Sequence, residues 1–146
     1  MLFRNIMVPY DGSKYSLHAF KIALDLAQKY DSKLTVLTCL AKPEYRGVWY
    51  YDSHHAKAVL KKEEKAAREN ISKMIEPTKK KTDVPINVKI IPTVRIADQI
   101  ASFAKSHKID LVVMGSHGRT GFDKMILGSV AHGVSQKVHC PVMIAK

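Results

Sequence analysis

Five short runs rich in Val, Ile and Leu recur along the chain, and a segment with helical periodicity lies between each run and the next. Runs of this length and composition are typical of buried strands. The predicted strands are Phe3–Val8, Leu34–Leu40, Ile86–Ile91, Asp110–Met114 and Val142–Ala145. Right-handed crossovers assemble such an alternation into a parallel sheet with helices on both faces. The sequence therefore predicts an α/β fold with five parallel strands and four helices.

Each intervening segment predicts a helix with one apolar face. The first begins at Ser13, a good N-cap. The second runs from about His55 to Glu76, and we expect it to end before Pro77 because proline disfavours helical geometry at the preceding residue. The third covers about Arg95 to Ser106, and the fourth begins near Asp123.

Length and charge limit the classes of protein that fit. A chain of 146 residues has the length of one domain, so residues 1–146 are expected to form a single domain. Its 24 Lys and Arg against 13 Asp and Glu give a net charge of +11, which would attract phosphates, nucleic acids or acidic partners. The second predicted helix is strongly basic, and we interpret this as a solvated face rather than a nucleic-acid footprint.

Neither a membrane nor an oxidising compartment is indicated. The charge at Arg4 and the turn at Pro9 leave no apolar run at the N-terminus long enough for a signal peptide or a membrane span. The two cysteines, Cys39 and Cys140, lie in separate apolar stretches and do not have the spacing of a zinc site. We therefore expect a cytoplasmic protein.

Glycines gather after the fourth predicted strand. Gly115, Gly118 and Gly121 lie in one loop, and Gly128 and Ser129 fall within or at the start of the last helix. Glycine lets a backbone approach a ligand closely, and consecutive N–H groups in such a loop form an anion-binding nest. In an open parallel sheet, ligands bind beyond the C-terminal ends of the strands. The pattern predicts a phosphate-bearing ligand.

Three familiar phosphate-related folds are excluded. The loop lacks the Gly-Lys-Ser/Thr of a Walker A motif, and no Gly-x-Gly-x-x-Gly follows the first strand. A phospho-acceptor receiver domain needs an aspartate after the third strand, where this chain has Ile91-Pro92-Thr93.

The chain resembles the universal stress protein family over essentially its whole length. The pattern Gly115-x-x-Gly118, nine residues and Gly128-Ser129 is similar to the family's ATP-binding signature. The opening Ile6–Ser13, the run Asp110–Gly118 and the ending Cys140–Ile144 also match in order and spacing. The resemblance implies a Rossmann-like sheet in the order 3-2-1-4-5.

The resemblance also implies the residues of a nucleotide site. Asp11 would contact the nucleoside, and backbone groups near Cys39 and Leu40 would bind adenine. The other expected members line the pocket or hold the ribose and phosphates: Pro9, Met114, Gly115, Ser116, His117, Gly118, Arg119, Gly128, Ser129 and Val130. The family usually has a glycine and then a proline where this chain has Val94 and Ile96, and we expect the bulkier side chains to affect adenine affinity.

The implied ligand is ATP, with Mg²⁺ or Mn²⁺ held through the phosphates, and the implied role is a nucleotide-responsive regulator of stress adaptation. No general base is evident beside the loop, so an enzymatic reading extends at most to slow hydrolysis or autophosphorylation. A nucleic-acid binder using the basic surface is the other alternative, disfavoured because the basic residues are spread along the chain. The strand Val142–Ala145 is expected at a sheet edge, where the resemblance implies homodimer pairing. The aromatic connection Tyr45–Tyr51 covers a ligand or partner, or packs on the neighbouring helix.

Overall fold

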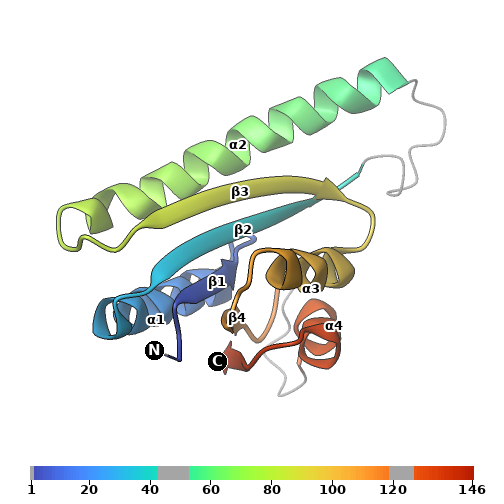
Figure 1. Cartoon of the computed structure of the whole chain (residues 1–146). Coiled ribbons are helices and arrows are strands. Elements are labelled where there is room, and N and C mark those ends of the chain that lie inside the picture. The colour runs from blue at the N-terminus through green and yellow to red at the C-terminus, as the bar shows by residue number, and fades with distance from the viewer. Residues whose placement is uncertain (1, 43–52, 119–126) are drawn as a thin grey trace.

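The computed structural model describes residues 2–42, 53–118 and 127–146. Five strands form one sheet in the order β3-β2-β1-β4-β5, and each neighbouring pair is parallel. The strands are β1 (Asn5–Pro9), β2 (Lys33–Ala41), β3 (Ile86–Thr93), β4 (Leu111–Gly115) and β5 (Val142–Ala145). The helices are α1 (Lys14–Tyr30), α2 (Ser53–Lys79), α3 (Ile96–Ser106) and α4 (Ser129–Lys137). The predicted α/β class and strand order are confirmed (Figure 1).

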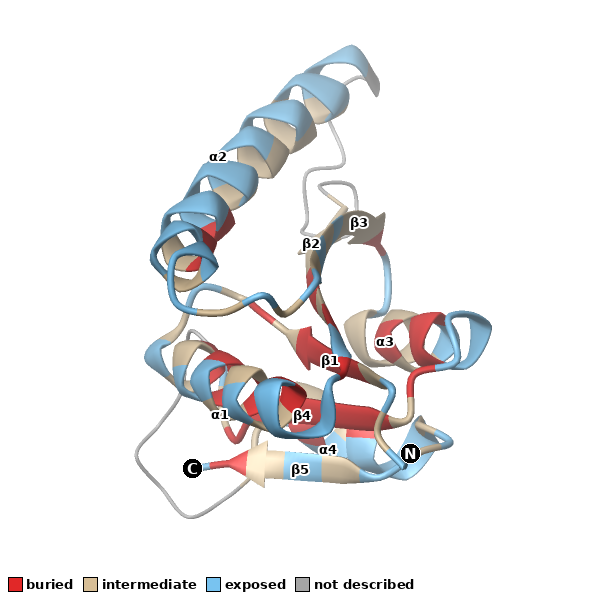
Figure 2. Ribbon diagram, turned by 60° about the vertical axis from the view of Figure 1, so that its left-hand side comes forward, coloured by how far each residue is buried: buried red, intermediate tan, exposed pale blue. Residues whose placement is uncertain are grey.

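Two apolar cores lie on opposite faces of the sheet. Ile6 and Val8 of β1 pack into the core beneath α1 and α2, and Met7 between them packs into the core beneath α3 and α4. Successive strand residues point to opposite faces, so a strand covered on both sides needs an unbroken apolar run. Figure 2 shows the buried central strands β1 and β4 between the helices. This double burial is why the strand runs were recognisable in the sequence.

The start of α1 follows the prediction. Ser13 is the N-cap, and its Oγ accepts a hydrogen bond from the N–H of Ser16 at 3.1 Å. At the other end, Asp31 adopts a left-handed conformation (φ 55°). The N–H of Ser32 then donates to the carbonyl of Ala27, which closes the helix.

The prediction that the second helix ends before Pro77 is wrong, because α2 continues through Pro77 to Lys79. A proline so close to the helix end removes only one late backbone hydrogen bond. Ile71 and Ile75, one turn apart, are buried in the core beneath α1 and α2, and Thr78 Oγ donates to the carbonyl of Ile75 at 2.6 Å. This hydrogen bond joins the residue after Pro77 to the buried turn before it, so the helix continues across the proline.

The predicted start of the fourth helix near Asp123 is also corrected. Asp123 itself lies outside the described residues, but Leu127 and Gly128 are described and are not helical. Gly128 is the N-cap of α4, with an extended backbone at φ −61° and ψ 157°. Its N–H donates to the carbonyl of Ser116 at 2.8 Å, so the chain is still part of the loop at this point and α4 begins at Ser129.

The other boundaries lie within two residues of the predicted ones, as helix and strand ends commonly do. The strand β5 matches its predicted bounds, and α3 begins one residue later than predicted, with Arg95 as its N-cap. Among the described residues, no helix combines the length and apolar character needed to cross a membrane.

The contact between α3 and α4 provides a test of the packing. A Cβ built on Gly133 would lie 2.9 Å from the Cβ of Ala97. We predict that Gly133→Val destabilises the protein by about 1–3 kcal/mol, because the added side chain forces the helices apart. The measurement is the free energy of unfolding in urea, with Ala97→Gly added in a second variant to relieve the clash. An undiminished cost in the double variant would show that the clash is not the cause.

Candidate functional site

The candidate site lies at the C-terminal edge of the sheet, between β1 and β4. From β1 the chain enters α1 on one face, and from β4 it proceeds to α4 on the other (Figure 1). Connections that diverge in this way leave a crevice beyond the strand ends, which is the common ligand position in open α/β sheets. Pro9 ends β1 and Gly115 ends β4, so both predicted motifs begin at this edge of the sheet.

Asp11 is oriented by the first turn of α1. Its Oδ1 accepts hydrogen bonds from the N–H of Ser13 and the Oγ of Ser16, both at 2.9 Å. Gly12 between them has φ 84°, a conformation that residues with a Cβ rarely adopt. A carboxylate at a helix N-terminus is also stabilised by the helix dipole. The turn therefore presents Asp11 in one orientation, half-buried, at the end of β1.

The loop after β4 reaches Asp11. A Cβ built on Gly118 would lie 3.2 Å from Asp11 Oδ2, so this loop and the turn after β1, far apart in the sequence, come together. Gly115 is equally constrained, because a Cβ there would lie 2.7 Å from the Cβ of Tyr15. These glycines allow the loop to pass directly over the start of α1.

Two further loop residues are held in place by hydrogen bonds and a ring contact. Ser116 is buried, its N–H donates to the carbonyl of Ala145 at 3.0 Å, and its Oγ lies 2.9 Å from His117 Nδ1. The His117 ring packs beside the Tyr15 ring, with centroids 5.2 Å apart. The imidazole is thus part of the contact between the loop and α1.

The start of α4 closes the other side of the loop. The hydrogen bond from Gly128 to Ser116 places the first turn of α4 beside the loop, and a Cβ on Gly128 would lie 3.3 Å from His117 Cα. The first N–H groups of a helix have no partner within it and attract anions. Ser129 is exposed at this turn and Val130 is half-buried. Asp11, the loop and the first turn of α4 therefore surround one edge of the sheet.

The remaining predicted residues lie at the end of β2, in the core, or outside the described residues. Cys39 and Leu40 lie half-buried near the end of β2, and Cys39 packs against the core beneath α3 and α4. Burial raises the pKa of the Cys39 thiol to about 11, so the thiol is protonated at neutral pH. Met114 is buried in the same core, beneath the site rather than on its surface. Arg119 and the aromatic connection Tyr45–Tyr51 lie outside the described residues.

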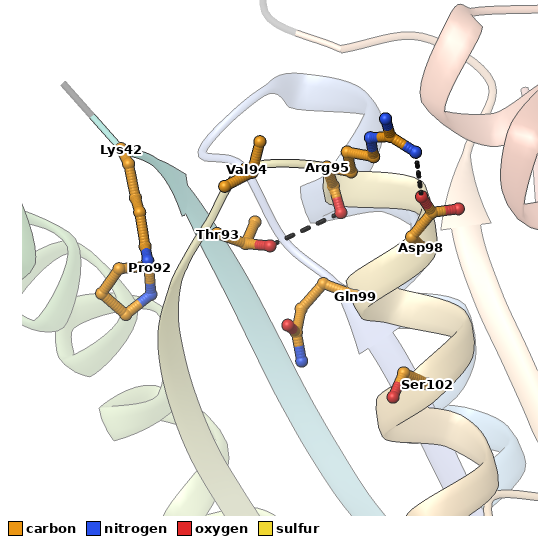
Figure 3. A pocket seen from close by; sticks show the side chains of 8 residues that line it. All are labelled: Lys42, Pro92, Thr93, Val94, Arg95, Asp98, Gln99 and Ser102. Atoms are coloured by element: carbon orange, nitrogen blue, oxygen red, sulfur yellow. Dashed lines mark hydrogen bonds and ion pairs between the residues drawn. The ribbon is translucent and has the colours of Figure 1, made fainter. Parts of the chain in front are cut away.

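Two open hollows adjoin the strand ends, and both include residues that the sequence analysis missed. One, of about 390 Å³, lies between α3 and α4 and is lined by Val94, Arg95, Ile96, Ala97, Asp98, Ser129, Val130 and Lys137. The other, of about 400 Å³, is lined by Lys42, Pro92, Thr93, Val94, Arg95, Asp98, Gln99 and Ser102 (Figure 3). Lys42 and Arg95 each follow the C-terminal end of a strand, and this position in the sequence could have indicated that they lie near the site. Val94, exposed to 44%, lines both hollows, whereas Ile96 packs into the core beneath α3 and α4.

The described part of the chain shows no metal site formed by side chains. It contains no group of three or more His, Cys, Asp or Glu side chains that could hold a metal ion.

Several known proteins with similar sequences are universal stress proteins. The model of the universal stress protein family matches residues 2–146. A universal stress protein of Methanocaldococcus jannaschii is 34% identical over 146 residues, which cover 99% of this chain and 83% of the relative.

Solved structures of the same name share the fold. A universal stress protein of Lactobacillus plantarum superimposes with a TM-score of 0.82 at 24% identity and covers 100% of this chain and 99% of its own. Two others were solved with ligands: one in complex with cAMP (TM-score 0.70, 20% identity, 100% and 98% covered) and one from Archaeoglobus fulgidus in complex with dAMP (TM-score 0.67, 20% identity, 100% of both chains covered). With the family model spanning residues 2–146, the chain belongs to the universal stress protein family.

Proposed function

We propose that this protein binds an adenine nucleotide at the edge between β1 and β4. The observation that carries the proposal is the close approach of Gly118 to Asp11, with Gly128 closing the loop behind them. It is supported by the complexes of two structural neighbours with cAMP and dAMP, both adenine nucleotides.

The chemistry of the edge assigns the two ends of the nucleotide. A carboxylate repels phosphate and accepts hydrogen bonds from hydroxyl groups, so Asp11 receives a hydroxyl of the nucleoside. The glycine loop and the first turn of α4 offer N–H donors without interfering side chains, so the phosphates lie there. Adenine then extends toward the end of β2, at Cys39 and Leu40.

We further propose ATP as the nucleotide, with Mg²⁺ or Mn²⁺ coordinated by its phosphates and water. Both ions prefer oxygen ligands and commonly bind through phosphates with few protein groups. The protein then acts in the cytoplasm as a regulator whose surface or partners change when the nucleotide binds.

Replacing Gly118 tests the phosphate loop. A Val side chain there would enter the space between the loop and Asp11 Oδ2, so we expect Gly118→Val to lower Mg-ATP affinity by at least about ten-fold while the fold is retained. Titration calorimetry measures the affinity and circular dichroism the fold. Ala66→Val on the exposed face of α2 is the matched control and should bind normally. A folded Gly118→Val variant with unchanged affinity would remove the loop from the site.

Replacing Asp11 tests the orientation of the nucleotide. A hydrogen bond to a charged group contributes about 1.5–3 kcal/mol, so Asp11→Asn should weaken ATP binding by roughly ten-fold or more. Binding of inorganic triphosphate should not weaken, because that ligand has no nucleoside. Asp25→Asn, on the exposed side of α1, serves as the control. Equal losses for both ligands would place Asp11 at the phosphates, the metal or the fold.

We also propose that the protein is a homodimer paired through β5. This strand lies at one end of the sheet and pairs only with β4 in the described chain. Its outer N–H and C=O groups are therefore available to pair with a second strand. Met143 in its centre is 39% exposed. Antiparallel pairing about a two-fold axis would satisfy both strands at once.

A charge on that edge tests the dimer. Met143→Lys should shift the protein toward monomer, because two lysines would face each other across the two-fold axis. Gln136→Lys adds the same charge at an exposed position of α4 and should leave the dimer intact. Sedimentation over a concentration series at fixed salt gives the masses. A wild-type monomer at high micromolar concentration, or a dimeric Met143→Lys variant, would contradict the proposal.

A further inference from the structure

Arg95 occupies the corner between the end of β3 and the start of α3. Its backbone is fixed: the carbonyl accepts hydrogen bonds from the N–H of Gln99 at 3.0 Å and from Thr93 Oγ at 3.5 Å. Its side chain, by contrast, is 82% exposed. A fixed backbone with an exposed guanidinium lets the cation move over a limited region around the corner.

This region includes the first turn of α4. Arg95 lines the hollow of about 390 Å³ between the two helices, and Ser129 and Val130 line the same hollow from α4. The close contact of Gly133 with Ala97 fixes the two helices relative to each other. An anion bound at the start of α4 would therefore lie beside a hollow that already contains a cation.

The charges around Arg95 leave this cation available. Asp98 accepts a short hydrogen bond from Lys137 Nζ, and this bond lowers the pKa of the Asp98 carboxyl below its ordinary value. Arg95 Nη1 lies 3.8 Å from the other carboxylate oxygen of Asp98 (Figure 3). Two cations thus share one carboxylate, so the group carries a net positive charge. The contact of Arg95 with Asp98 is longer and more exposed than that of Lys137, and exposed ion pairs contribute little stability.

We propose that Arg95 binds the phosphate groups of the nucleotide and thereby favours nucleotides with several phosphates over nucleosides and monophosphates. The inference rests on the proposed nucleotide site. Arginine suits this role because its planar guanidinium offers two parallel N–H donors to phosphate oxygens. The cation leaves Asp98 when phosphate is present, and Lys137 remains to neutralise that carboxylate.

The test compares the affinity of one set of ligands for the wild type and for variants at fixed ionic strength. Adenosine, AMP, ADP and ATP are titrated without and with Mg²⁺ into the wild type, Arg95→Gln and Arg95→Lys by calorimetry. We expect Arg95→Gln to lower ATP affinity about ten-fold and ADP affinity less, and to leave adenosine within two-fold. Arg95→Lys should restore part of the loss because it keeps the charge. Lys105→Gln removes one charge at the far end of the same helix and should change nothing.

Each outcome decides between the two proposals. If the wild type binds ATP and Arg95→Gln behaves like Lys105→Gln, the role of Arg95 is wrong and the nucleotide site stands. If Arg95→Gln weakens adenosine as much as ATP, Arg95 serves the nucleoside or the fold and the phosphate role is again wrong. If the wild type binds none of the four ligands, the proposed function itself fails.

Discussion

The hydrogen bond from the N–H of Gly128 to the carbonyl of Ser116 connects the end of β4 to the start of α4. It keeps Gly128 extended, so the helix begins one residue later and its first turn lies beside the loop. Because α4 packs closely on α3 at Gly133, fixing the start of α4 also fixes the hollow that Arg95 lines. This backbone contact thus joins the loop to the helix start, and the packing at Gly133 connects the helix to the hollow.

The other wall of the site depends on α1. Ser13 and Ser16 bond to each other and to Asp11, so the helix start and the carboxylate are positioned together. The loop can approach this wall only because Gly115 and Gly118 have no Cβ. Close backbone approach on one side and a fixed carboxylate on the other produce an edge with distinct ends for a sugar and for phosphates.

Much of the fold was predictable because its strands are buried on both faces and therefore read as continuous apolar runs. The wrong boundaries share one cause. The helix α2 continues past Pro77, where Thr78 bonds back to Ile75, and α4 begins only after Gly128 has bonded to Ser116. Local preferences around Pro77 and Asp123 carry no information about such contacts.

The candidate site likewise has residues that could be predicted from the sequence and one that could not. The glycines and Asp11 stood out because their spacing restricts the backbone, and the structure brings Gly118 to Asp11. Arg95 did not stand out among the 24 Lys and Arg, because its position after a strand does not by itself show what the side chain faces. Its significance comes from the hollow that it shares with Ser129, a property of how α3 and α4 pack. The roles of these residues in binding remain predictions.

Hydrogen exchange of backbone amides with and without Mg-ATP tests whether the nucleotide binds at the edge between β1 and β4, since it reports on every part of the chain at once. We expect slower exchange at residues 10–16, 115–118 and 128–131, and little change in the C-terminal half of α2. Protection confined to α2 and β3, with residues 115–118 and 128–131 unchanged, would show that the nucleotide binds elsewhere.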